Sequence, residues 1–76
     1  MNKERRKRIN DIIDRLNDIQ SEVVELQEEE QDAYDCLPES IQESERGEAM
    51  MDAVDNLESA ASNLEDAVSY LEEATV

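Results

Sequence analysis

Carboxylates are the only abundant side chains in this sequence with the potential for chemistry. The 76 residues include 22 Asp and Glu, a single Cys and no His. Paired carboxylates act as general acid and base only inside a pocket that tunes them. Carboxylates also bind Ca²⁺, but the sequence has no Asp-x-Asp-x-Asp-Gly loop, and without His no zinc site is expected. We therefore expect no metal, no cofactor and no acid-base site.

The remaining reactive residues predict no catalysis either. Cys36 has no histidine to activate it, and as the only cysteine it cannot form an intramolecular disulfide. We expect it to be a small apolar filler near a turn. Gly47 is the only glycine, so no glycine-rich phosphate loop is present. The chain is predicted not to be an enzyme.

The charges are strongly segregated along the chain. Five of the seven bases lie within the segment Lys3–Arg8, and residues 9–76 hold 21 acids against Arg15 and Arg46, a net charge of −19. Such a field repels nucleic acid and anionic membranes and attracts basic protein surfaces. We expect a protein partner with a basic surface and no direct nucleic-acid or membrane partner.

Two interpretations of Lys3–Arg8 remain open. The segment could contact nucleic acid, which would make the protein a nucleic-acid-binding accessory. Alternatively, it pairs with acids near the end of a returning helix, namely Glu65, Asp66, Glu72 and Glu73. We favour ion pairing, because the acidic body opposes phosphates at close range.

Hydrophobic spacing predicts the elements that carry these charges. Steps of three and four residues indicate one helical stripe and a helix over about 3–35. The predicted helix-helix seam in this part of the chain consists of Ile9, Ile12, Leu16, Ile19, Val23 and Leu26. The same rhythm continues through Glu30, where an acid either sets the register or marks the point where the helices splay. Pro38 then ends the helix.

A turn and a second helix follow. We expect a turn with a short helical piece over about 36–46, with Ser40 and Glu43 spaced as a capping box and Ser44 as a second candidate cap. A helix over about 47–75 contributes the other half of the seam: Val54, Leu57, Ala61, Leu64, Val68 and Leu71. Ala53, Ala60, Ala67 and Ala74 recur every seven residues, small enough for a neighbouring backbone to approach closely.

These elements predict an all-α fold. Two long amphipathic helices joined by a short turn form an antiparallel two-helix hairpin, a coiled coil within a single domain, 1–76. Additional apolar residues widen the stripes and predict a homodimer that packs as a four-helix bundle: Ile13, Val24, Tyr34, Met51 and Tyr70. We expect no signal peptide, because the basic start is followed by an acid-rich amphipathic pattern and not by an apolar run, and no apolar segment approaches membrane length. A cytoplasmic protein is therefore expected.

The acids around the turn are the candidate partner-binding surface. A run of acids is often only a solvated face. Here, however, two groups converge at one end of the hairpin, so a functional binding surface and a merely solvated face are about equally favoured. The candidate residues are Glu25, Glu28, Glu29, Glu30, Asp32, Asp35, Glu39, Glu43, Glu45, Glu48, Asp52 and Asp55.

Three segments carry a family resemblance. The stretch 37–50, LPESIQESERGEAM, followed by Asp55-Asn56-Leu57-Glu58 and preceded by the opening Met1–Ile9, resembles small uncharacterised acidic proteins of bacteriophages and bacterial mobile elements. The resemblance implies a bacterial host cytoplasm and supplies no site residues. Phages commonly encode small acidic proteins that imitate the charge of nucleic acid, and this genomic setting suggests such a role by analogy and not from the fold.

Two functions therefore follow as hypotheses. In the first, the chain is an inhibitor or regulator that occupies a basic, nucleic-acid-handling defence or host protein by charge mimicry. In the second, it is a structural or adaptor coiled coil that binds a partner helix through its apolar stripe.

Overall fold

The computed structural model describes all residues, 1–76. The chain consists of three helices and short irregular segments, and it has no strand. Helix α1 spans Lys3–Asp35, the short α2 spans Glu39–Gln42, and α3 spans Glu45–Ala74. The all-α class predicted from hydrophobic spacing is confirmed. No helix is sufficiently long and apolar to cross a membrane.

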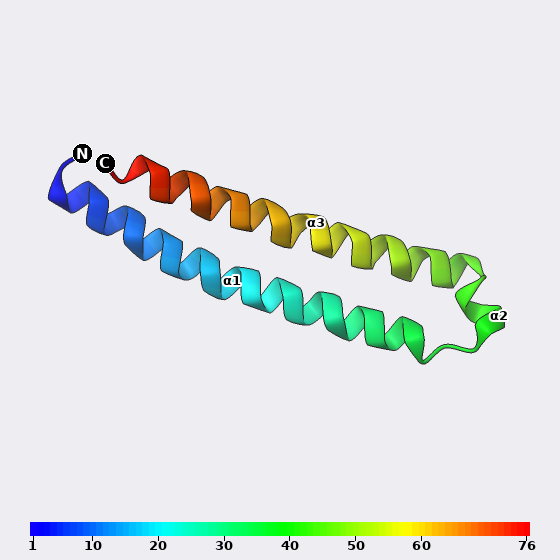
Figure 1. The fold of residues 1–76 in the computed structure, drawn as a ribbon. Helices are drawn as coiled ribbons and strands as arrows, with labels where there is room; N and C mark the ends of the chain where they lie inside the picture. The colour runs from blue at the N-terminus through cyan, green and yellow to red at the C-terminus, as the bar shows by residue number, and fades with distance from the viewer.

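The two long helices lie side by side and run in opposite directions. Both chain termini are at one end of the molecule, and α2 is at the other (Figure 1). The Cα atoms occupy 58 × 14 × 11 Å, so the molecule is a rod two helices wide. At the terminal end, the Met1 amino group donates to the Val76 carbonyl O at 3.2 Å, and Arg6 Nη2 donates to the same oxygen at 2.9 Å.

Side-chain caps begin both long helices. Asn2 Oδ1 accepts from the Arg5 backbone N–H at 2.8 Å, and Ser44 Oγ accepts from the Gly47 N–H at 3.5 Å. Each cap satisfies a backbone donor that the first helical turn leaves without an intrahelical partner. The capping box predicted at Ser40 does not form, because Ser40 lies inside α2 and Ser44 is the cap.

The turn is held by backbone groups at the end of α1. The Leu37 N–H donates to the Tyr34 carbonyl O at 3.0 Å, and Gln42 Nε2 donates to the same oxygen at 3.0 Å. Pro38 then starts α2 without a side-chain cap. Cys36, expected as an apolar filler, is instead exposed at the C-terminal cap of α1.

The seam between α1 and α3 is narrow. The buried apolar side chains are Ile13, Val54, Ala61 and Val68. Ile13 and these α3 residues occupy heptad position a, and position d is filled by half-buried residues at seven-residue spacing: Ile9, Leu16, Val23 and Glu30 on α1, and Met50, Leu57, Leu64 and Leu71 on α3. Glu30 therefore does lie in the seam, half-buried.

The predicted seam of α1 is wrong at every second residue. Ile12, Ile19 and Leu26 are 37%, 45% and 53% exposed, whereas Ile13 is 8% exposed. Two rows flank the row that begins at Ile9 and Leu16, and three-four spacing fits either one. The row of Ile12 is apolar, whereas the row of Ile13 continues as the half-buried Gln20, Gln27 and Tyr34. The contact with α3 selects the row of Ile13, so the other row, at heptad position g, is left outside the seam.

Gly47 is required by the close approach of α3 to the turn. It is buried, and a Cβ at this position would lie 2.1 Å from the Gln42 carbonyl O. Backbone atoms cannot move aside as a flexible side chain can. The first turn of α3 can therefore pack against the end of α2 only because residue 47 has no side chain.

We expect Gly47→Ala to lower the thermal unfolding midpoint, although Gly to Ala inside a helix usually stabilises by roughly 1 kcal/mol. The clash with Gln42 should reverse that sign. Circular dichroism melting is the measurement, and Ser59→Ala on the exposed surface of α3 is the matched control. A midpoint equal to or above that of the wild type would contradict the close approach.

A second pair of variants tests which row of α1 faces α3. Ile13→Ala should cost about 2 kcal/mol or more of unfolding free energy, because it removes a buried side chain, whereas Ile12→Ala should cost less than about 1 kcal/mol. Urea unfolding is measured at a concentration at which sedimentation gives the monomer mass. Equal losses in the two variants would place Ile12 in the seam.

Candidate binding surfaces

The acidic residues near the turn gather at one end of the rod. They come from the last part of α1, from α2 and from the first part of α3, which meet there because α3 runs back along α1 (Figure 1). Of the twelve candidate acids, eleven are exposed and only Glu30 is half-buried. We call the eleven exposed candidates the acidic turn end.

Little within the chain neutralises the acidic turn end. Arg46 is the only base between residues 16 and 76. Among the side-chain hydrogen bonds, one reaches a carboxylate of this group, from Gln31 Nε2 to Asp35 Oδ1 at 3.0 Å. The other carboxylate oxygens accept no side-chain hydrogen bond from the chain and are available to a partner.

Charges along α1 oppose its macrodipole. The positive N-terminal end of a helix favours acids and the negative C-terminal end favours bases. In α1, the bases of Lys3–Arg8 crowd the first turns, with Glu4 as the only acid in the first turn, and the last turn has no base and contains Asp32 and Asp35. The side chains therefore make α1 positive at its N-terminus and negative at its C-terminus. This charge distribution interacts unfavourably with the macrodipole at both ends of the helix.

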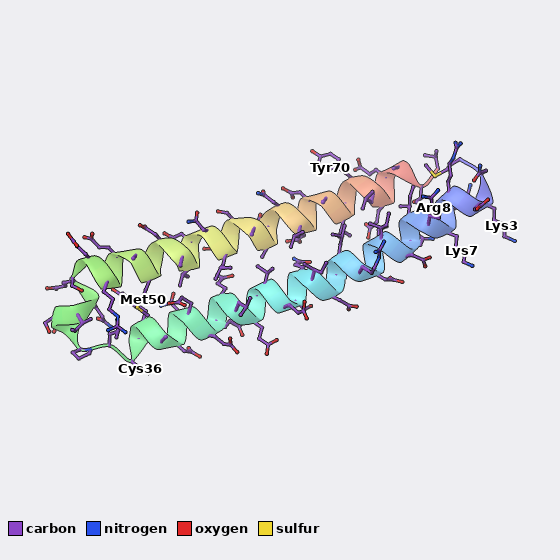
Figure 2. All side chains as sticks on the ribbon, turned by 180° about the vertical axis from the view of Figure 1, so that it is seen from behind. Lys3, Lys7, Arg8, Cys36, Met50 and Tyr70 are labelled. Atoms are coloured by element: carbon purple, nitrogen blue, oxygen red, sulfur yellow. The ribbon has the colours of Figure 1, made fainter.

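The basic segment Lys3–Arg8 lies at the end opposite the turn. In Figure 2, Lys3, Lys7 and Arg8 are at one end of the rod, and Cys36 and Met50 are at the other. Two hydrogen bonds join this end of α1 to the C-terminal end, from Arg6 Nη2 and from the Met1 amino group, and both go to the main-chain O of Val76 and not to an Asp or Glu side chain. The expected pairing with Glu65, Asp66, Glu72 and Glu73 is absent from these bonds.

A shallow hollow of about 240 Å³ lies beside the basic segment. It is lined by three apolar residues, Met1, Ile9 and Ile12, and by two arginines, Arg5 and Arg8. No group of three or more Cys, His, Asp or Glu residues is positioned to hold a metal ion.

A second surface is apolar. In an antiparallel pair of helices, position g of one helix lies beside position g of the other. The g residues here are Ile12, Ile19 and Leu26 on α1, and Ala53, Ala60 and Ala67 on α3. We call these six residues the apolar face. The half-buried d residues lie just beneath it. On the opposite side of the rod, position e holds Asn10, Asn17 and Gln31 on α1 and Glu58, Glu65 and Glu72 on α3, together with the half-buried Val24 and Met51.

Sequence reasoning placed the large residues of the apolar face in the seam and so missed this surface. The signal that identifies it was nevertheless present in α3. Alanine recurs every seven residues beside the leucine row, at Ala53, Ala60 and Ala67, and small side chains at this spacing allow a neighbouring backbone to approach closely.

Comparison with known proteins finds no matching protein-family model, no matching curated protein and no matching solved structure. Function must therefore be inferred from the two surfaces.

Neutralising part of the acidic turn end should stabilise the fold. We expect the triple variant Glu28→Gln, Asp32→Asn, Asp52→Asn to raise the melting midpoint by about 5 °C in low salt, because like charges at one end repel each other. The gain should shrink at about 0.5 M NaCl, where screening acts within a few ångströms.

The control for this measurement is Glu4→Gln. It also removes one acid, but from the first turn of α1, where the acid favours the macrodipole and lies among bases. Its midpoint should fall or stay unchanged. A rise of similar size in both variants would show that net charge, and not its concentration at the turn, sets the cost.

Proposed function

We propose that this chain is a non-catalytic interaction protein that binds a basic, nucleic-acid-handling protein through its acidic turn end. The observation that carries the proposal is the eleven exposed carboxylates at the end of a rod, with Arg46 as the only base nearby. In this proposal the chain acts as a closed two-helix hairpin. A rigid hairpin holds the carboxylates in fixed positions, so binding orders few side chains.

Charge mimicry of nucleic acid is the proposed mechanism. A basic channel that neutralises phosphates gains affinity by releasing counterions, and a dense row of carboxylates offers the same electrostatic term. Acids at outward heptad positions b and f alternate along both helices and form such a track: Glu25, Glu28, Asp32 and Asp35 on α1, and Glu48, Asp52 and Asp55 on α3. Association of this type is fast and falls steeply with salt.

The setting suggested by the resemblance in residues 37–50 is consistent with this role. An inhibitor carried by a phage or mobile element would act in the cytoplasm of a bacterial host, where restriction and other defence proteins expose basic nucleic-acid channels. The partner class is therefore a defence or host protein with such a channel, and the proposal requires neither a cofactor nor a metal.

A second candidate function has its own support. The apolar face exposes three large side chains, Ile12, Ile19 and Leu26, at the seven-residue spacing that a partner helix recognises. In this alternative the chain is a structural or adaptor coiled coil, and the simplest form is association with a second copy as a four-helix bundle.

Charge reversal tests the first function. The variant with Glu25, Glu28, Asp32, Glu43, Asp52 and Asp55 all changed to Lys has a net charge of −3 instead of −15, since each change adds two charges. Partners captured from bacterial lysate by wild-type protein at low salt, and identified by mass spectrometry, should be lost from this variant and from wild type at high salt.

The matched control reverses six acids outside the acidic turn end: Asp11, Glu58, Glu65, Asp66, Glu72 and Glu73, all to Lys. It has the same net charge of −3. It should retain the partner, provided that circular dichroism shows equal helix content in both variants. Retention of the partner by both variants would overturn charge mimicry, and a partner resistant to high salt would favour the adaptor function.

A further inference from the structure

The apolar face forms one continuous strip along the middle of the rod. It runs about 21 Å, from Ile12 to Leu26 at 1.5 Å per residue, and with the 14 Å width of the rod it covers about 300 Å², the size of an apolar patch that is often a binding site. The half-buried d row, including Leu57 and Leu64, adds apolar surface immediately beneath Ala60. Four buried apolar side chains are few for a chain of 76 residues, which leaves stability to be gained by covering this face.

The flank of this face on α3 carries no charge. Heptad position c borders the g row on its outer side, and on α3 it is occupied by Ala49, Asn56, Asn63 and Tyr70. The acids of α3 lie at positions b, e and f instead. Tyr70 is 73% exposed, a large aromatic side chain at the edge of the face. In a chain with a net charge of −15, this uncharged strip is the side on which another helical rod can approach without burying carboxylates.

The flank of the apolar face on α1 carries charges that are complementary to those of a second α1 running in the opposite direction. Position c holds Arg8 and Arg15 toward the N-terminus and Glu22 and Glu29 toward the turn, at intervals of seven residues. When a second copy of this row runs in the opposite direction, its two acids lie opposite the two bases of the first copy, and its two bases lie opposite the two acids. An antiparallel contact of α1 with α1 of another copy thus pairs opposite charges, whereas a parallel contact pairs like charges.

We propose that a second copy of this chain covers the apolar face, with α1 packed antiparallel on α1 of the second copy and the contact centred on Ile19. This inference rests on the second function proposed above, that the apolar face is a binding surface, and it specifies the occupant and its orientation. Ile19 meets its own counterpart, and Ile12 meets Leu26 of the second copy. Arg15 then lies within one residue, about 1.5 Å along the axis, of Glu22 of the second copy.

The hollow at the basic end fits the same arrangement. Reversal about Ile19 brings residues 26–33 of the second copy over it. Its apolar lining at Ile9 and Ile12 receives Leu26 of the second copy, and its two arginines, Arg5 and Arg8, lie opposite the acids that follow Leu26. Glu30, a carboxylate half-buried without a hydrogen bond from a side chain, thereby gains opposite charges nearby.

The competing orientation is unfavourable electrostatically. With both copies pointing the same way, the two basic segments lie at one end and the two acidic turn ends at the other. With antiparallel copies, each basic segment lies near an acidic turn end, which offsets the reversed charge polarity of α1. The outward acids at positions b and f remain exposed in the dimer, whereas Glu29 of the acidic turn end lies in the contact.

The first arm of the test is sedimentation of wild type and of two charge variants at about 0.15 M salt. Wild type should sediment as a dimer at micromolar concentration. Arg15→Glu should weaken the dimer by roughly tenfold, because each substitution acts at two symmetric contacts. Adding Glu22→Arg to the same chain should restore the affinity, since both partners of each contact are then inverted.

The second arm reports orientation. In a Cys36→Ser background, Ile19→Cys should form an intermolecular disulfide rapidly in an antiparallel dimer, because the two Ile19 side chains meet. Asp18→Cys, one residue away on the outward surface, is the control and should cross-link slowly. Both sites are exposed, and circular dichroism confirms that the variants fold.

The two arms separate the possible failures. Sedimentation as a monomer at about 100 μM overturns both the dimer and the orientation, and binding of a foreign basic helix by that monomer would assign the face to another occupant. A dimer in which Ile19→Cys cross-links no faster than Asp18→Cys, and in which Glu22→Arg fails to rescue Arg15→Glu, overturns only the orientation. Lysate capture through the acidic turn end is read separately and is unaffected by either result.

Discussion

The contact between α1 and α3 is a single seam, and its narrowness governs the rest of the molecule. Two helices can bury only the sides that face each other, so each helix keeps most of its circumference in water. Ile13 on α1 and Val54, Ala61 and Val68 on α3 supply the buried apolar groups. Every other apolar residue of the long helices is half-buried or exposed. The second apolar row on α1, that of Ile19, has no place in this seam and becomes surface.

Charge and apolar surface are kept apart around the rod. Acids occupy outward positions on both helices, whereas the apolar face between Ile19 and Ala60 has an uncharged border on α3. A chain with a net charge of −15 repels other anions over its outward surfaces, but it can still present one smooth side to a helical neighbour. The acidic turn end and the apolar face therefore lie on different sides of the rod and differ in chemistry.

The turn converts two separate acidic stretches into one surface. Ser44 caps α3, Gln42 is tied to the end of α1 through the Tyr34 carbonyl, and Gly47 lets α3 begin against α2. These contacts leave no long flexible loop between the helices. The carboxylates on both sides of the turn are thus held near one another, although their mutual repulsion opposes this arrangement.

Much of the architecture can be read from residue spacing. Apolar steps of three and four indicate two long helices, Pro38 and the polar residues after it indicate the break between them, and the distribution of acids indicates a charged end, because these depend on neighbours close in the chain. The identity of the cap is harder, since Ser40 and Ser44 both have suitable neighbours in sequence. Only the packing of α2 against α3 makes Ser44 the cap.

Tertiary structure decided which side of α1 faces α3. Ile12 and Ile13 are adjacent in sequence, and both fit the three-four rhythm with Ile9 and Leu16, yet they point to different sides of the helix. Spacing records that a helix is amphipathic but not which of two overlapping stripes meets its neighbour. The position of α3 selects Ile13, and with that choice Ile12, Ile19 and Leu26 pass from predicted core to exposed surface. The physical reason is that rotation of a helix about its own axis changes no local interaction, so only contacts with distant residues can determine it.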